Sequence, residues 1–268
     1  MSAGTSVAPS PLARWVILGV VGLLFAVPIV SMLGFTLRGG ADGALTIERW
    51  TAILDPENAR AYRNLFQGVG NSLLLAVVTV AIVLAVLVPT MLLVAIRYPR
   101  LRRVVEFVCI VPITIPAIVL VVGLAPVYSV VTRLAGSSVW TLAFAYGVTV
   151  LPYAYRAIQS NLSAVDVVTL SEAARSLGAP WVSVLFRVLL PNLRRGILAA
   201  AFITVAVVLG EFTIASLLNR VNLQTALVQV SRSDPYTAVI FSLLALAFAF
   251  TLLLVIGRIT AARPRRTP

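Results

Sequence analysis

The sequence contains no lysine and no histidine, and its one cysteine is Cys109. Without lysine it has no G-x-x-x-x-G-K-[ST] phosphate loop, so it does not bind ATP in that way. Without histidine, Ser-His-Asp and Cys-His catalytic arrangements are excluded. Cys109 has no second cysteine or histidine beside it, so we expect a small buried apolar residue. We therefore predict a chain that is not an enzyme and that binds no cofactor or metal.

Charged residues are also scarce: they make up 11 % of the chain, whereas hydrophobic residues make up 60 %. A soluble domain carries about 25 % charged residues, so this composition indicates a membrane protein. The net charge of +12 does not indicate nucleic-acid binding. The arginines stand at the ends of apolar runs, where they set membrane topology, and no basic run is interleaved with aromatic residues.

Six apolar stretches are long enough, or nearly so, for the roughly 20 residues that a bilayer requires. They are residues 15–35, 71–96, 107–132, 134–155, 196–218 and 236–257. The first lacks an A-x-A cleavage pattern, so we interpret it as an uncleaved span rather than a signal peptide. The third contains Pro112, Pro116 and Pro126, which predict a kink or a helix that lines a pathway.

The distribution of arginine predicts the orientation of the spans. Fourteen of the 21 arginines fall on the side that holds both termini, so we expect that side to be cytoplasmic. The chain is then one domain, with a cytoplasmic segment at 1–14, a six-helix unit at 15–261 and a basic tail at 262–268. An outer loop at 38–70 has a possible short amphipathic helix through Trp50, and a long cytoplasmic loop covers about 159–195.

The cytoplasmic loop predicts two short helices. Ser163 is a suitable N-cap, with Asp166 in the favourable first turn. Gly178 suits a left-handed cap, and Pro180 suits the first turn of a second helix, which Pro191 ends or bends. The first helix has an apolar face formed by Val167, Leu170, Ala174 and Leu177, and the second has one formed by Trp181, Val184, Leu185, Val188 and Leu189. Such helices either lie on the lipid surface or dock a soluble partner.

The same loop resembles the E-A-A-x-x-x-G-x(9)-I-x-L-P signature of permease subunits of binding-protein-dependent ABC importers. Six of its seven positions match, namely Glu172, Ala173, Ala174, Gly178, Leu190 and Pro191, and Val188 replaces the usual isoleucine. The resemblance extends from about Asn71 to the C-terminus. It implies an all-α, six-helix permease of the type I importer (MetI-like) fold. It also implies a coupling helix that docks on the ATPase, where Glu172 pairs with a basic group, the two alanines allow close approach and Gly178 sets the bend.

The resemblance also implies the partners of the chain. These are ATP-binding cassette subunits that use ATP and Mg, a second permease subunit that we expect to be a different chain, an extracytoplasmic substrate-binding protein and the lipid of a bacterial inner membrane. Residues 172–179 read E-A-A-R-S-L-G-A, which is closer to permeases for polyamines, ferric iron, thiamine and inorganic anions than to those for sugars. Residues 210–218 resemble the polyamine and iron branch, so we expect a small polar solute such as a polyamine.

One acid lies within an expected span. A carboxylate there costs about 2.5–3.5 kcal/mol, which makes Glu211 a candidate residue of the translocation pathway that favours a cationic substrate. Alternatively, Glu211 pairs with Arg220 or a polar neighbour, or reaches water. Glu106 is expected to pair with Arg102. A secondary transporter predicts repeated halves and more intramembrane charges, and a membrane scaffold has no need of the pattern from Glu172 to Pro191.

Overall fold

The structure is a computed structural model that describes residues 10–39, 44–58 and 60–261. Its regular secondary structure is helical, and one isolated bridge joins Arg38 to Leu45 in the described part of the chain. The expected all-α fold is therefore confirmed. Most of the N-terminal segment at 1–14 and the whole basic tail at 262–268 lie outside the described residues.

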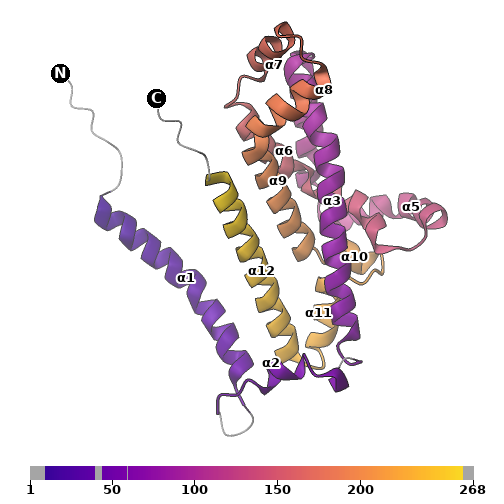
Figure 1. The fold of residues 1–268 in the computed structure, drawn as a ribbon. Helices are drawn as coiled ribbons and strands as arrows, with labels where there is room; N and C mark the ends of the chain where they lie inside the picture. Colours follow the sequence, from indigo (N-terminus) through magenta and orange to yellow (C-terminus); the bar gives the residue numbers. More distant parts are fainter. Residues whose placement is uncertain (1–9, 40–43, 59, 262–268) are drawn as a thin grey trace.

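Six long helices form the body of the molecule (Figure 1). They are α1 (Pro11–Leu37), α3 (Arg63–Ile96), α5 (Ala117–Ala135), α6 (Ala143–Leu162), α9 (Leu190–Gly210) and α12 (Pro235–Ala261). The shorter helices are α2 (Glu48–Ala52), η1 (Pro56–Asn58), η2 (Pro99–Leu101), α4 (Arg102–Ile110), η3 (Val111–Thr114), η4 (Val139–Leu142), α7 (Val167–Ser176), α8 (Trp181–Ser183), η5 (Val184–Leu189), α10 (Thr213–Leu217) and α11 (Leu223–Ser231).

Five helical stretches are long and apolar enough to cross a membrane, and α6 corresponds to the remaining expected span. The less apolar α6 packs against both α3 and α9 in the centre of the bundle, with Tyr146, Val150 and Ala154 almost fully buried. Protein therefore covers much of α6, and its sequence can be more polar than that of a lipid-facing helix. The backbone of Gly196 in α9 meets Asn161 at the end of α6, where a Cβ on the glycine would lie 2.7 Å from the Cβ of Asn161.

The first helix attaches to the bundle at the end nearest α2. The ring of Phe35 stacks on Tyr236 of α12 at 4.5 Å, and the Arg49 guanidinium lies 3.1 Å from the centre of the same tyrosine ring. The Trp50 indole donates to the Thr36 hydroxyl at 3.2 Å. Away from this contact α1 diverges from α12 (Figure 1), and its most apolar stretch contains no buried residue. Most of α1 is therefore free to meet lipid or another protein.

Three expected spans have different boundaries in the structure. The third is not one helix, because α4 ends at Ile110, η3 ends at Thr114 and α5 begins after Pro116. Proline lacks the N–H that would continue the helical ladder, and α5 leaves the side of the bundle (Figure 1). The fourth, expected at 134–155, begins at Ala143 after a turn at Gly136 and ends at Leu162. The fifth ends at Gly210, so Glu211 is not inside a helix.

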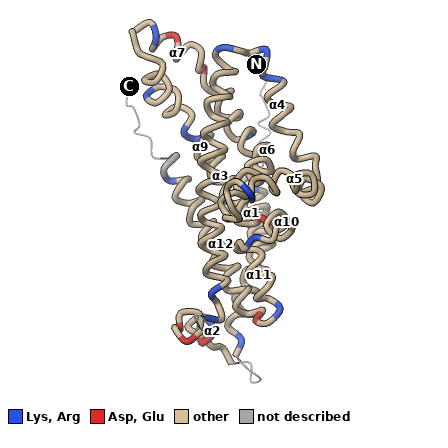
Figure 2. Tube along the Cα trace, turned by 90° about the vertical axis from the view of Figure 1, so that its right-hand side faces the viewer, with Lys and Arg blue, Asp and Glu red and all other residues tan. Residues whose placement is uncertain are grey.

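Charged residues gather at the two ends of the bundle, with few at intermediate heights (Figure 2). The start of α1, the end of α12 and α7 lie at the same end of the molecule (Figure 1). This arrangement agrees with an even number of crossings. The short helix expected near Trp50 is α2, at the opposite end.

Candidate functional site

The first helix of the loop begins at Val167 and is capped by Asp166, not by Ser163. The two carboxylate oxygens of Asp166 accept from the Thr169 backbone N–H at 3.1 Å and from the Thr169 hydroxyl at 2.7 Å. These bonds lower the pKa of Asp166 below its ordinary value. Ser163 instead closes α6, since its hydroxyl donates to the Ser160 carbonyl at 3.1 Å. The turn from 163 to 166 separates α6 from α7, so the residue after the turn becomes the cap.

The helix α7 has one buried face and one exposed face. Val167 and Ser171 are buried against the bundle, and Ala174 is half-buried on the same side. Glu172 and Ala173 lie on the exposed face. The acid and the first alanine of the signature are therefore available to a partner, whereas the second alanine partly packs inside.

The helix ends at Gly178 in a Schellman motif. The Gly178 N–H donates to the Arg175 carbonyl at 2.9 Å, and the Ala179 N–H donates to the Ala174 carbonyl at 3.1 Å. The φ angle of Gly178 is +83°, which confirms the expected left-handed cap. Leu177 was expected on the buried face, but it is 89 % exposed because the turn directs it outward. It extends the free surface formed by Glu172 and Ala173.

A second interaction holds the turn and was not predicted from the sequence. The Arg175 guanidinium donates to the Ala179 carbonyl at 3.0 Å and lies 5.4 Å from the centre of the Trp181 ring. A basic residue in the last turn of a helix is suited to binding free backbone carbonyls. The position of Arg175 in the last turn of α7 was therefore the sequence signal for this interaction. Arg175 therefore ties the end of α7 to the start of α8.

A cleft of about 840 Å³ opens beside this turn. Glu172 and Arg175 line it from α7, and Trp181 lines it from α8. The end of α3 forms the opposite wall, including Tyr98, which follows the helix. The exposed helix face and the cleft together form a continuous candidate surface at this end of the bundle.

Leu190 and Pro191 do not join this surface. Leu190 packs against the core, and Pro191 lines a separate small pocket with Asn161 and Val165 near the end of α6. The helix does not end at Pro191, because it continues from Trp181 to Gly210 and bends on the way (Figure 1). The π-helical segment η5 ends at Leu189, two residues before the proline. Its wider turn accommodates a residue that has no N–H to donate.

Glu211 follows the last residue of α9 and occupies a gap between two helices. One carboxylate oxygen accepts from the Ile214 N–H at 2.9 Å and so caps α10. The other, Oε2, is buried and has no hydrogen-bond partner among the described residues. The Asn222 amide donates to the Glu211 backbone oxygen at 2.6 Å and to the Tyr146 hydroxyl at 3.2 Å. The alternative of an ion pair with Arg220 is not found in the described residues.

A layer of amide and hydroxyl groups surrounds this gap, and the sequence analysis did not identify it. The Asn71 amide donates to the Val221 carbonyl at 2.7 Å, and the Ser72 hydroxyl accepts from the Leu223 N–H at 2.8 Å. The Gln224 amide donates to the Leu209 carbonyl at 2.8 Å. These side chains satisfy backbone groups where α9 stops, as irregular backbone within a membrane protein requires. The expected partner of Glu106 is also corrected: its carboxylate lies 3.9 Å from the guanidinium of Arg156 on α6, and it makes no ion pair with Arg102.

A model of the family described as binding-protein-dependent transport system inner membrane component matches residues 81–263. The chain belongs to this family. The matched region contains both the loop around Gly178 and the gap at Glu211. The permease is thus a multi-pass membrane protein of the ABC importer type.

Two curated relatives agree with this assignment. The permease is 26 % identical over 276 residues to a protein of Sinorhizobium fredii named as a probable ABC transporter permease protein, y4fN, covering 95 % of the permease and 47 % of that relative. It is 30 % identical over 144 residues to the phosphate transport system permease protein PstA of Pasteurella multocida, covering 53 % and 50 %. The permease spans about half the length of these relatives.

Proposed function

We propose that this permease forms the translocation pathway of an ABC importer and docks its ATPase through α7. The exposed face of α7 beside the fixed turn at Gly178 carries the proposal, because it lies between two membrane helices within the family match. The family match supports an importer over an ion-driven transporter or a membrane scaffold.

The other parts of the importer are separate chains in this proposal. ATP-binding cassette subunits bind ATP and Mg, an extracytoplasmic binding protein delivers the solute, and the permease itself catalyses no bond chemistry and binds no nucleic acid. The location is a bacterial inner membrane, with both termini and α7 on the cytoplasmic side. The excess of arginine at that end supports the orientation.

A second permease subunit, a different chain, completes the pathway. The exposed apolar surfaces of α1 and α5 support this, since neither helix is covered by the bundle along most of its length. The y4fN protein is about twice as long as the region matched here, so its chain is long enough to contain two units of this size.

One continuous helix connects the docking site to the gap at Glu211. The stretch Trp181–Gly210 has 30 residues, so it is about 45 Å long. It begins at the Gly178 turn and ends immediately before Glu211. In this proposal, movement of α7 by the ATPase is transmitted along this helix to the gap at Glu211 inside the bundle, which is what alternating access requires.

We propose a polyamine as the transported solute, with Glu211 in the pathway. The buried Oε2 atom without a partner supports a role toward a cation. The second candidate is an inorganic anion, which the similarity to a phosphate permease favours. Ferric iron, thiamine and sugars are further alternatives. Uptake of labelled spermidine and labelled phosphate, measured in parallel with the cognate binding protein, separates these candidates, and phosphate uptake alone rejects the polyamine.

The docking proposal is tested by co-purification of the permease with its ATPase. Because Glu172 is exposed and proposed to face a basic group, Glu172→Arg should weaken the complex by about 30-fold, from roughly 2 kcal/mol for a disrupted interfacial charge pair. Ser176→Arg also places an arginine on the exposed end of α7 but removes no carboxylate, and it serves as the control for the added cation. Equal retention of the ATPase by both variants and the native chain rejects the docking role of Glu172.

A further inference from the structure

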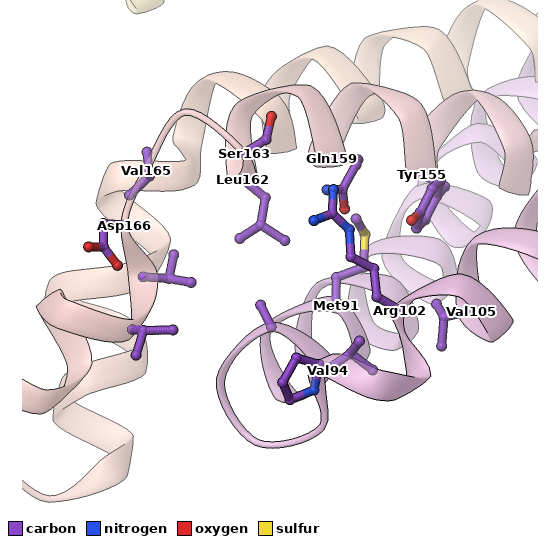
Figure 3. A pocket seen from close by; sticks show the side chains of 14 residues that line it. Met91, Val94, Arg102, Val105, Tyr155, Gln159, Leu162, Ser163, Val165 and Asp166 are labelled. Atoms are coloured by element: carbon purple, nitrogen blue, oxygen red, sulfur yellow. The ribbon is translucent and has the colours of Figure 1, made fainter.

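A small cavity lies at the base of α7, between the ends of α3 and α6 and the start of α4 (Figure 3). Its volume is about 200 Å³. Much of its lining is apolar, including Met91 and Val105, but Arg102 and Gln159 extend toward one another over it (Figure 3). The side chains of these two residues make no hydrogen bond within the described part of the chain. The cavity therefore suits a ligand with a polar head and an apolar body.

The segment that contributes Arg102 to the cavity is strongly basic. Four arginines, Arg97, Arg100, Arg102 and Arg103, occupy seven consecutive positions. None of their side chains makes an ion pair or hydrogen bond with a described residue. The one acid nearby in the sequence, Glu106, already lies 3.9 Å from Arg156. The cluster is therefore available to an anion from outside the chain.

The helix that follows the cluster faces outward with apolar side chains. Val104, Phe107 and Val108 are exposed, and Phe107 is 70 % exposed. Cys109 lies on the opposite side and is buried in the core. In a membrane the exposed side chains contact acyl chains, so the arginines at the start of α4 lie at the level of the lipid headgroups. The anion at this level with matching charge and shape is a lipid phosphate.

We propose that this cavity binds the headgroup of an anionic phospholipid, with Arg102 and Gln159 donating hydrogen bonds to its phosphate. Asp166 lines the opposite wall, and both of its oxygens accept from Thr169. The negative charge of Asp166 opposes the phosphate and moderates its affinity. Because Asp166 also caps α7, a bound lipid lies against the base of the docking helix. The proposal rests on the proposed function in taking this end as the cytoplasmic face.

The test uses the full chain in nanodiscs of phosphatidylcholine with added phosphatidylglycerol. Native mass spectrometry measures the phosphatidylglycerol that each variant retains. Arg102→Gln should reduce retention about fivefold, which corresponds to the roughly 1 kcal/mol contributed by one arginine near an anionic surface. Asp166→Asn should increase retention, because asparagine remains a good N-cap but carries no charge. Arg258→Gln, at the same end of the bundle on α12, is the control and should leave retention unchanged.

Two results overturn the proposal. One is an equal loss in the Arg102 and Arg258 variants, which indicates unspecific attraction to the surface. The other is displacement of the lipid by free inorganic phosphate, which indicates a site for a soluble anion. If Arg102→Gln does not fold, lipid retention is compared in the double variant Arg100→Gln/Arg103→Gln and in Asp166→Asn. The proposal then requires reduced retention in the first and increased retention in the second. Co-purification of the ATPase with the same preparations is a separate measurement, so a failure of the docking proposal is distinguished from a failure of this one.

Discussion

Position 178 requires glycine because of its backbone conformation and not because a side chain there would clash. Its φ angle is +83°, and no atom lies within 4 Å of the position that a Cβ would take. An L-residue in this region costs roughly 1–2 kcal/mol, and a β-branched residue costs more. The relation between α7 and α8 therefore depends on one dihedral angle, which a substitution can change without creating a clash.

This gives a graded prediction for Gly178. The Gly178→Val variant should reduce co-purification of the ATPase by about tenfold, equivalent to 1.4 kcal/mol of lost turn stability. The Gly178→Asn variant should lose less than about threefold, since asparagine tolerates the left-handed region. Both side chains enter open space, so the comparison isolates the backbone. Equal losses in the two variants would contradict the conformational explanation.

Glu211 combines a structural and a proposed functional role in one carboxylate. Its Oε1 atom caps α10 through Ile214, and its Oε2 atom has no partner among the described residues. The capping bond explains why an acid is tolerated here, but it uses one oxygen. The second oxygen is buried, and its role toward a cationic solute is the proposed function of Glu211.

Substitutions of Glu211 separate these two roles. In Glu211→Gln the amide oxygen still accepts from Ile214, so we expect normal assembly with the ATPase but reduced uptake of a cationic solute. In Glu211→Ala the cap is lost as well, and the amides of α10 should exchange hydrogen faster. Uptake assays and hydrogen exchange on the same membranes provide the two measurements. Normal uptake by Glu211→Gln would exclude Glu211 from the pathway.

At the scale of elements, the long helix from Trp181 to Gly210 depends on the π segment before Pro191. The π turn of η5 accommodates the proline without ending the helix. It also sets the rotation of α8 relative to α9. The orientation of Trp181 at the docking end thus depends on a proline ten residues away.

Pro191→Ala should make this helix more regular and should reduce the transport activity. Alanine restores the missing N–H, so the π turn can relax to α-helical spacing, which changes the rotation of α8 by about 100° per residue of register. We expect a higher thermal unfolding temperature together with lower ATP-dependent uptake. Pro152→Ala in α6 is the matched control, since it also removes a helix proline but lies outside this connection. Unchanged uptake in Pro191→Ala would contradict a role for the π segment.

At the scale of the whole molecule, the two ends of the bundle differ in charge and in shape. The end with α7 carries most of the arginines and the candidate docking surface. The opposite end carries α2 and α11, whereas α10, which follows Glu211, lies between the two ends (Figure 1). We therefore expect the two ends to face opposite sides of the membrane.

Cysteine labelling tests this orientation directly. Cys109 is buried, so Cys109→Ala provides a background without reactive thiols. In this background, Ser176→Cys in α7 should react with an impermeant maleimide only after the cells are permeabilised. Ser231→Cys at the end of α11 should react in intact cells, since Ser231 is exposed at the opposite end. The reverse pattern would invert the proposed topology.

Local rules were sufficient for some elements and insufficient for others. The left-handed turn at Gly178 was predicted because it depends on one residue and its neighbours. The break in the third span was missed: its prolines predicted a kink, but the direction of α5 depends on packing against other helices. The capping role of Asp166 was missed because Ser163 was interpreted as the N-cap and Asp166 as an acid of the first turn. The order of bundle contacts, in which α6 is central, could not be derived from apolar length, which measures contact with lipid rather than with protein.

The sequence by itself determined that the chain crosses a membrane, that it has no phosphate loop of the Walker type and that its loop carries a family signature. These follow from composition and short spacings, which do not require knowledge of the fold. Only the tertiary structure decided that Glu211 lies in a gap beside Asn222, that Leu190 and Pro191 lie apart from Glu172, and that Arg102 and Gln159 line one cavity. Each of these depends on how helices distant in sequence approach one another, and side-chain packing between helices sets that approach.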